Sequence, residues 1–210
     1  MIQIIQNTLG SVMTNVYTVY NEESKEAFIV DPSASSKVLI GQLEKRGLKL
    51  KAILLTHAHF DHIGAVNDLK SYWPEAKVYV GEIDEEMLSD PRLNLSEAFE
   101  GNPVIVRADK TVRDNEVISI LGMDIKCIHT PGHTSGSISY YAEDIKTVFS
   151  GDTLFSGSVG RSDFPTGNEN TLLKSIEEKL FTLPEDTSVL PGHDSLTTIG
   201  REKKYNMFFN

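Results

Sequence analysis

The chain has 210 residues, of which 40% are hydrophobic, and this length and composition suit one folded domain with a substantial core. Asp and Glu number 30 against 20 Lys and Arg, and the resulting net charge of −10 disfavours a nucleic-acid partner, whose phosphates require clustered basic residues. The sequence contains no apolar run of about 18 residues, so we expect no membrane span.

The cysteine count and the N-terminal residues bear on the cell compartment. Cys127 is the single cysteine, so no internal disulfide can form, which fits a reducing environment. The first residues lack the basic region and the long apolar stretch of a secretory signal. We therefore expect a cytoplasmic protein.

Short apolar runs and amphipathic stretches alternate through the first half of the chain. Branched runs bounded by polar residues predict strands, and an apolar face that repeats every three to four residues predicts helices. We expect strands at residues 2–5, 14–20, 27–30, 52–55 and 77–80, and helices at 35–46, 63–72 and 83–88. Residues 90–102 have weak periodicity and fit either a lid or an ordinary surface loop.

The second half is richer in strands. We expect them at residues 104–106, 117–120, 125–128, 137–141, 147–149 and 187–190, with a helix from Asn170 or Thr171 to about Leu180 and a short basic helix after Thr197. No segment repeats and no linker divides the sequence, so a single domain over residues 1–210 is expected. This order of elements fits an α+β fold with two β-sheets packed face to face and helices outside.

The most informative stretch runs from Thr56 to His62 and contains three of the six histidines together with one aspartate. Imidazole and carboxylate are ligands for zinc and similar divalent ions, so a metal site is favoured over a polar loop with unrelated histidines. Side chains alternate along an extended strand, so we expect His57 and His59 to point the same way. Asp61 and His62 follow where a helical pattern begins, and they can serve a second position nearby.

Three later stretches place His or Asp beside glycine, each directly after a predicted strand. They are residues 129–134, 150–153 and 190–194, and their candidate ligands are His133, Asp152 and His193. Small neighbouring residues allow backbone and metal to approach closely. Loops at strand ends are a common place for functional side chains on a rigid scaffold.

The pattern His57-x-His59-x-Asp61-His62, followed by His133, Asp152 and His193, resembles the metallo-β-lactamase-fold hydrolases over essentially the whole chain. The resemblance implies a four-layer αβ/βα sandwich with a dinuclear metal site at one edge. It implies one metal held by His57, His59 and His133, another held by Asp61, His62 and His193, and Asp152 as the bridge. The cofactors implied are two divalent ions per chain, zinc first, with iron and manganese as alternatives.

Two further stretches resemble the glyoxalase II-like branch of this family: Phe-Ser-Gly-Asp-Thr-Leu-Phe at 149–155 and Gly-Arg-Ser-Asp-Phe at 160–164. Pro-Gly-His at 191–193 and the residues after it resemble the short, single-domain bacterial members. Full-length glyoxalase II enzymes have a C-terminal helical domain that supplies glutathione contacts. This chain ends at Asn210 without such a domain, which leaves the thiol carrier open.

Four other residues have two interpretations each. Arg161 falls near a lysine that contacts glutathione in glyoxalase II enzymes, and it can bind a substrate carboxylate or pair with Asp163. Asp31 can accept a hydrogen bond from a ligand imidazole or simply form an Asp-Pro turn. We expect His129 to lie outside the ligand set, and we expect Cys127 to be a buried, inert thiol rather than a nucleophile.

The resemblance implies a metal-dependent thioester hydrolase similar to hydroxyacylglutathione hydrolase. Its substrate would be a 2-hydroxyacyl thioester such as S-lactoylglutathione, attacked by a metal-bridging hydroxide that Asp61 orients and deprotonates. The expected partner is therefore a small thioester or ester, with no nucleic acid and no membrane, and the oligomeric state is left open.

Other enzymes of the same fold are alternatives. A persulfide dioxygenase would use one iron held by His57, His133 and Asp152, and a lactonase or another ester hydrolase would use the same metal pair. A β-lactamase is not expected, because those enzymes generally lack a bridging aspartate at the position of Asp152.

Overall fold

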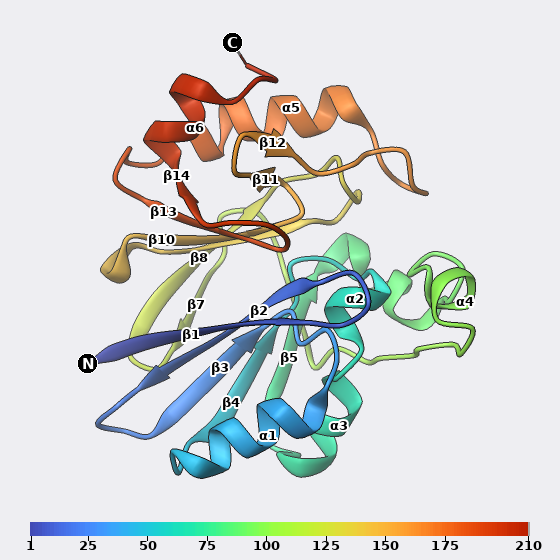
Figure 1. The fold of residues 1–210 in the computed structure, drawn as a ribbon, viewed down its shortest axis with the longest axis vertical. Coiled ribbons are helices and arrows are strands. Elements are labelled where there is room, and N and C mark those ends of the chain that lie inside the picture. Colours follow the sequence, from blue (N-terminus) through green and yellow to red (C-terminus); the bar gives the residue numbers. More distant parts are fainter. Residues whose placement is uncertain (210) are drawn as a thin grey trace.

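The computed structural model describes residues 1–209, so Asn210, where the expected single domain ends, lies outside the described residues. Two β-sheets pack face to face between two layers of helices (Figure 1). The first sheet contains, in spatial order, β1 (Ile2–Leu9), β2 (Thr14–Asn21), β3 (Glu26–Val30), β4 (Lys49–Leu54), β5 (Lys77–Gly81) and β6 (Lys110–Val112). The pairs β1–β2 and β2–β3 are antiparallel, whereas β3 to β6 are parallel.

The second sheet is mainly antiparallel. It contains, in spatial order, β14 (Thr197–Thr198), β13 (Ser188–Pro191), β10 (Thr147–Gly151), β9 (Ile138–Ala142), β8 (Met123–His129) and β7 (Val117–Ile120). The pair β10–β13 is parallel. A small separate hairpin is formed by β11 (Leu154–Phe155) and β12 (Ser158–Val159).

Helices cover the outer faces of both sheets (Figure 1). The first sheet is covered by α1 (Ser36–Lys45) and α3 (Val66–Tyr72), and the second by α5 (Glu169–Glu178) and α6 (Ile199–Tyr205). Two single-turn helices, α2 (Phe60–Ile63) and α4 (Ser96–Phe99), lie nearer the edge of the sandwich. The remaining turns are the 3₁₀ segments η1 (Glu82–Asp84), η2 (Glu86–Ser89), η3 (Glu143–Ile145) and η4 (Leu180–Thr182).

Strand alternation separates the core into three layers. On β3, Phe28 and Val30 pack between the sheets, while Ala27 and Ile29 pack toward the first helical layer. That layer contributes Leu39 and Leu43 of α1, which lie four residues apart and therefore on one face. The third layer lies between the second sheet and α5 and α6. The predicted four-layer αβ/βα sandwich is confirmed.

Some expected elements differ from the structure. Residues 104–106 were expected to form a strand but form none. The backbone of Val106 donates to the Leu88 carbonyl at 2.9 Å, and the sixth strand forms at 110–112 instead. The helix expected at 63–72 is divided into α2 and α3. The helix expected from Asn170 or Thr171 begins at Glu169, because the Asn168 side chain accepts from the Thr171 backbone N–H at 2.9 Å.

Two findings bear on further expectations. No helix among residues 1–209 is long and apolar enough to cross a membrane. The segment 90–102, expected to be a lid or a loop, contains the single turn α4 between irregular stretches.

The contact between the sheets predicts a stability effect. Phe149 on β10 is fully buried, and its ring centroid lies 5.6 Å from that of Tyr17 and 6.2 Å from that of Phe28 on the opposite sheet. Phe149→Ala should lower the free energy of unfolding by about 3–5 kcal/mol, because it opens a cavity between the sheets. Urea unfolding measures this change. Val38→Ala on the exposed face of α1 is the control, and it should change stability by no more than about 0.5 kcal/mol.

Candidate metal centre

The seven predicted ligands lie in loops and turns that follow strands of both sheets. His57 and His59 follow β4, Asp61 and His62 lie in α2, His133 lies between β8 and β9, Asp152 follows β10, and His193 follows β13. The expected strand alternation is wrong for His57 and His59, because β4 ends at Leu54 and both histidines lie in the loop beyond it. Their convergence therefore depends on the packing of that loop.

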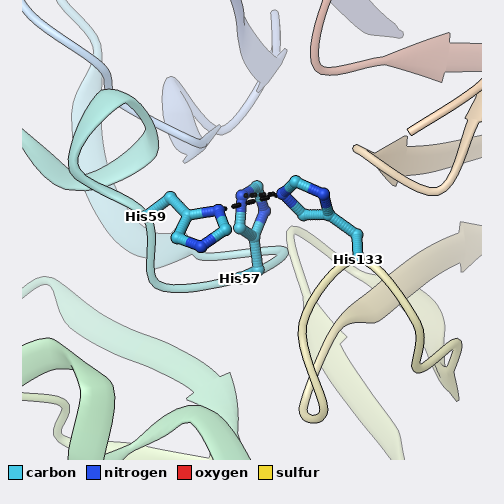
Figure 2. Close-up of side chains that lie close together, drawn as sticks. All are labelled: His57, His59 and His133. Carbon is cyan, nitrogen blue, oxygen red and sulfur yellow. Dashed lines mark hydrogen bonds between the residues drawn. The ribbon is translucent and has the colours of Figure 1, made fainter. Parts of the chain in front are cut away.

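Three imidazoles converge as one group (Figure 2). The Nε2 atom of His133 lies 3.1 Å from Nε2 of His57 and 2.9 Å from Nδ1 of His59. All three residues are at most 2% exposed. A tetrahedral zinc with Zn–N bonds of about 2.1 Å places its nitrogens about 3.4 Å apart, so small outward shifts would admit a metal among these atoms.

A second group lies beside the first and contains Asp61, His62 and His193. Asp61 Oδ2 lies 3.3 Å from His62 Nε2 and 3.2 Å from His193 Nε2. The carboxylate of Asp152 faces both groups. Its oxygens lie 3.5 Å from His62 Nε2, 3.5 Å from His193 Nε2 and 3.6 Å from His133 Nε2.

Hydrogen bonds outside the cluster determine which nitrogen of each imidazole faces inward. His133 Nδ1 lies 2.7 Å from the carbonyl oxygen of Arg161, which can only accept, so Nδ1 carries the proton and Nε2 presents a lone pair. The Thr56 hydroxyl donates its single proton to Asp31 at 2.6 Å. It therefore accepts from His57 Nδ1 at 3.1 Å, which leaves His57 Nε2 free to bind a metal.

Asp31 acts in the same way on His62. Its Oδ2 atom accepts from His62 Nδ1 at 3.0 Å, so that His62 Nε2 faces the cluster. Asp31 thus makes the imidazole hydrogen bond that was one of its two expected interactions. Its backbone has φ of +50°, a left-handed conformation that is uncommon for a residue other than glycine.

The two groups differ in charge. Burial, with nearby His62, holds the pKa of His57 well below its usual value, and burial lowers the pKa of His59 to about 3. These imidazoles are neutral and can bind a cation without losing a proton. In His193 burial acts in the same direction, but Asp152 and Asp61 outweigh it and raise the pKa to about 10. A metal at the second group must therefore displace a proton.

The cluster contains buried polar atoms that lack a partner. His62 Nε2 and Asp152 Oδ1 form no hydrogen bond within residues 1–209. Such atoms are costly in a folded protein unless another species satisfies them. Inward lone pairs, ionised carboxylates and unpartnered atoms together fit a divalent metal with His and Asp ligands.

Glycine beside the ligands is required by close packing, as the sequence suggested. A Cβ atom on Gly192 would lie 2.2 Å from Asp152 Oδ1 and 2.8 Å from His62 Cε1. Gly151, with φ of +51°, would place a Cβ 2.2 Å from the Thr56 hydroxyl oxygen. Any larger residue at either position would displace a candidate ligand or the residue that orients one.

The residues that β2 contributes to the site carry no signal in the sequence. Asn15 donates from its backbone N–H to the Gly192 carbonyl at 2.7 Å, and its amide donates to the carbonyls of Pro191 at 3.1 Å and Asp194 at 2.9 Å. Thr14 donates to Asp61 Oδ2 at 3.1 Å. These residues are ordinary strand residues in the sequence, and only their placement opposite the loop after β13 identifies them.

The remaining predicted residues also have defined positions. His129 lies outside both ligand groups, and its ring contacts the Ser135 carbonyl at 2.9 Å. Cys127 is buried, and burial raises the pKa of its thiol to about 12, as expected for an inert residue. Arg161 pairs with Asp163 through two contacts of 2.8 Å, and it also lines the pocket beside the cluster.

Residues 9–193 match the family model of the metallo-beta-lactamase superfamily, so the chain belongs to that superfamily. A probable metallo-hydrolase of Bacillus subtilis, YqgX, is 39% identical, over 96% of this chain and 95% of its own length. The hydroxyacylglutathione hydrolase GloC of Haemophilus influenzae is 36% identical, over 90% of each chain.

Three solved structures are similar to this chain over nearly its whole length. The BLEG-1 B3 metallo-beta-lactamase has a TM-score of 0.94 and 41% identity, with 99% of this chain and 100% of that one covered. TTHA1623 in a di-iron-bound form has a TM-score of 0.85 and 33% identity, with 97% of this chain and 99% of that one covered. ETHE1 from Myxococcus xanthus has a TM-score of 0.81 and 30% identity, over 98% of this chain and 83% of that one.

A pair of histidine variants tests the ligand set. His133→Ala removes an inward nitrogen from the first group, so metal content should fall, whereas His129→Ala should leave it nearly unchanged. Elemental analysis of both purified variants and of wild type measures the difference. Equal metal loss in both variants would show that the ligand set around residues 130–133 is wrong.

The role of β2 predicts a second effect. Asn15→Ala removes two hydrogen bonds to the loop that carries His193, so affinity for metal at the second group should fall about 10- to 100-fold. Titration of the metal-free protein with cobalt measures each affinity. Thr8→Val is the matched control, because it removes the hydrogen bond that the Thr8 hydroxyl donates to Asn15 Oδ1 at 3.1 Å and leaves both Asn15 amide bonds to the residues around His193 in place. Equal loss in the two variants would argue against positioning by Asn15.

Proposed function

We propose that the protein is a metal-dependent hydrolase of small thioesters, similar to hydroxyacylglutathione hydrolase. Its substrates would be 2-hydroxyacyl thioesters such as S-lactoylglutathione. The observation that carries the proposal is the presence of two complete ligand groups with Asp152 between them, at the wall of a pocket of about 420 Å³. The similarity to GloC supports the same chemistry.

The proposed ligand assignment follows the geometry of the two groups. His57, His59 and His133 would hold one ion, and Asp61, His62 and His193 the other, with Asp152 shared between them. Zinc is the first expectation, because these ligand types suit it. Iron or manganese would suit the same donors, and the similarity to TTHA1623, solved in a di-iron-bound form, supports testing iron.

Two bound divalent ions would acidify a water to a pKa near 7 and polarise the substrate carbonyl. The side chains of the protein would orient the nucleophile. Asp61 lines the pocket, and its Oδ2 atom is held by Thr14 at 3.1 Å beside two imidazoles, so it can accept a proton from a nucleophile at a fixed position. The buried Cys127 lies outside the lining of this pocket, which agrees with a reaction that uses no cysteine nucleophile.

Two rival activities have specific support. The similarity to ETHE1 keeps the mononuclear-iron persulfide dioxygenase as an alternative, and the similarity to BLEG-1 adds β-lactam hydrolysis to the activities worth assaying. A lactonase would use the same site, because a lactone is a cyclic ester. The second ligand group favours a dinuclear hydrolase, since a mononuclear centre would leave Asp61, His62 and His193 without a function.

Metal content and activity measured on one preparation test the proposal. About two ions per chain, with thioester hydrolysis that is lost on chelation and restored by added metal, is the expected outcome. Full activity with a single tightly bound ion, or oxygen consumption with glutathione persulfide in place of hydrolysis, would favour the dioxygenase. The substrate panel should also include a lactone and a β-lactam.

A substitution of Asp61 tests the dinuclear mechanism most directly. Asp61→Asn keeps the size but removes the charge, so it should weaken metal binding at the second group and leave a poorer proton acceptor. We expect kcat for thioester hydrolysis to fall at least about 100-fold, with little change in folding. Steady-state kinetics and metal content measured on the same samples check this. Wild-type turnover in a variant that has lost metal from the second group would refute the dinuclear mechanism.

A further inference from the structure

The pocket beside the metal centre is lined mainly by apolar side chains. Outside the candidate ligands, its lining includes Val12, Leu95, Val159 and four phenylalanines, Phe60, Phe99, Phe155 and Phe164. Its volume of about 420 Å³ is within the range of small-molecule sites. An apolar lining gains free energy by covering an apolar group and offers little to a charged one.

The phenylalanines form a continuous wall that begins at a ligand. The Phe164 ring lies 5.7 Å from the His59 ring, and Phe99 lies 6.0 Å from Phe164. Phe60 stacks on Phe99, with centroids 5.4 Å apart and planes within 5°. Phe155, in contact with His193 at 6.1 Å, is the fourth phenylalanine of the lining. Apolar surface therefore extends from the buried metal centre outward to α4.

The outer end of the wall is exposed. Phe99 on α4 is 56% exposed and Val12 in the β1–β2 turn is 44% exposed, and both line the pocket. The Ser11 hydroxyl donates to Glu100 at 3.4 Å, so the turn and the α4 segment meet at the mouth. A substrate whose carbonyl reaches the metal centre would lay its outer, larger part along this wall.

The charges around the pocket disfavour an anionic group. Among the described residues that line it, Arg161 is the only Lys or Arg, and the Asp163 carboxylate already accepts two of its hydrogen bonds. The central carbon of the guanidinium also lies over the Phe164 ring, 3.7 Å from its centroid. Asp194 adds a negative side chain to the lining. The described residues of the lining therefore leave no unpaired Lys or Arg for the two carboxylates of a glutathione moiety.

We propose that the larger part of the substrate, on the thiol side of the scissile bond, is an uncharged apolar alkyl or aryl group bound by the Phe60–Phe99–Phe164 wall. The proposal rests on the thioester hydrolysis proposed above and narrows its substrate class. The 2-hydroxyacyl part stays at the metal centre, and thioesters with an apolar carrier are better substrates than S-lactoylglutathione, whose carrier is an anionic peptide thiol. Phe99 is the residue that determines this specificity.

Three lactoyl thioesters that share the acyl group test the proposal. Their thiols are phenylmethanethiol, which is apolar, N-acetylcysteamine, which is uncharged and polar, and glutathione, which is anionic. For the metal-loaded enzyme, kcat/KM for the benzyl thioester should exceed that for the glutathione thioester by about tenfold or more. A preference for the glutathione thioester would overturn the proposal.

Three variants test whether the wall determines this preference for an apolar carrier. Phe99→Ala should lower the benzyl to N-acetylcysteamine ratio of kcat/KM severalfold, mainly through KM. Phe208→Ala, which removes an exposed phenylalanine outside the pocket lining, should leave the ratio unchanged. Arg161→Ala should not raise KM selectively for the glutathione thioester. A selective rise there, or an unchanged ratio in Phe99→Ala, would assign recognition to charge and overturn the proposal.

Binding of ketone analogues, in which a methylene replaces the thioester sulfur, separates this proposal from the proposed reaction. Isothermal titration calorimetry should show the phenyl-bearing ketone binding about tenfold more tightly than its methyl-bearing counterpart, and Phe99→Ala should reduce the difference. If the preference is present but no thioester is hydrolysed, the proposed reaction fails and the apolar site stands. If thioesters are hydrolysed but the two ketones bind equally, the apolar site is refuted and the reaction stands.

Discussion

The carboxylate of Asp31 is the interaction on which the metal centre depends. It accepts from the Thr56 backbone N–H at 2.8 Å, from the Thr56 hydroxyl at 2.6 Å and from His62 Nδ1 at 3.0 Å. Through Thr56 it fixes the orientation of His57 in the first group, and directly it fixes His62 in the second. One buried side chain thus determines which nitrogen faces the cluster in both groups, and the left-handed backbone at Asp31 is tolerated because these bonds hold it.

The centre also depends on the sandwich being closed. The first sheet positions His57, His59, Asp61 and His62, whereas the second positions His133, Asp152 and His193. The Tyr17 hydroxyl and the Asn15 amide of β2 donate across to the end of β13, at 2.7 Å and 3.1 Å to the Pro191 carbonyl. Packing of aromatic residues between the sheets therefore supports the site as well as the fold, because loss of sheet contact would separate the two halves of the ligand set.

The site combines a buried polar centre with an exposed apolar entrance. His57, His59, His62 and His133 are at most 2% exposed, and unpartnered nitrogen and oxygen atoms remain among the ligands. Outside them, Phe99 and Val12 are left in solvent, where apolar surface has a free-energy cost that a bound apolar group would remove. This contrast supports chemistry at an inner metal centre and recognition by the outer wall.

The sequence by itself determined the types of the candidate ligands, their order along the chain and most of the strands and helices. Three histidines and an aspartate in the stretch from Thr56 to His62 indicate a metal site, because both residue types bind divalent metals. Short runs in which apolar residues recur indicate strands, because successive side chains of a strand point to opposite faces of the sheet. Both signals are local. The strand expected at 104–106 failed because its hydrogen-bond partner is the turn η2 rather than a neighbouring strand, which a local pattern cannot specify. Only the tertiary structure brought Asn15 and Thr14 to the ligands and placed Phe99 beside Phe60 and Phe164, because those contacts join residues far apart in the chain whose types carry no signal of metal or substrate binding.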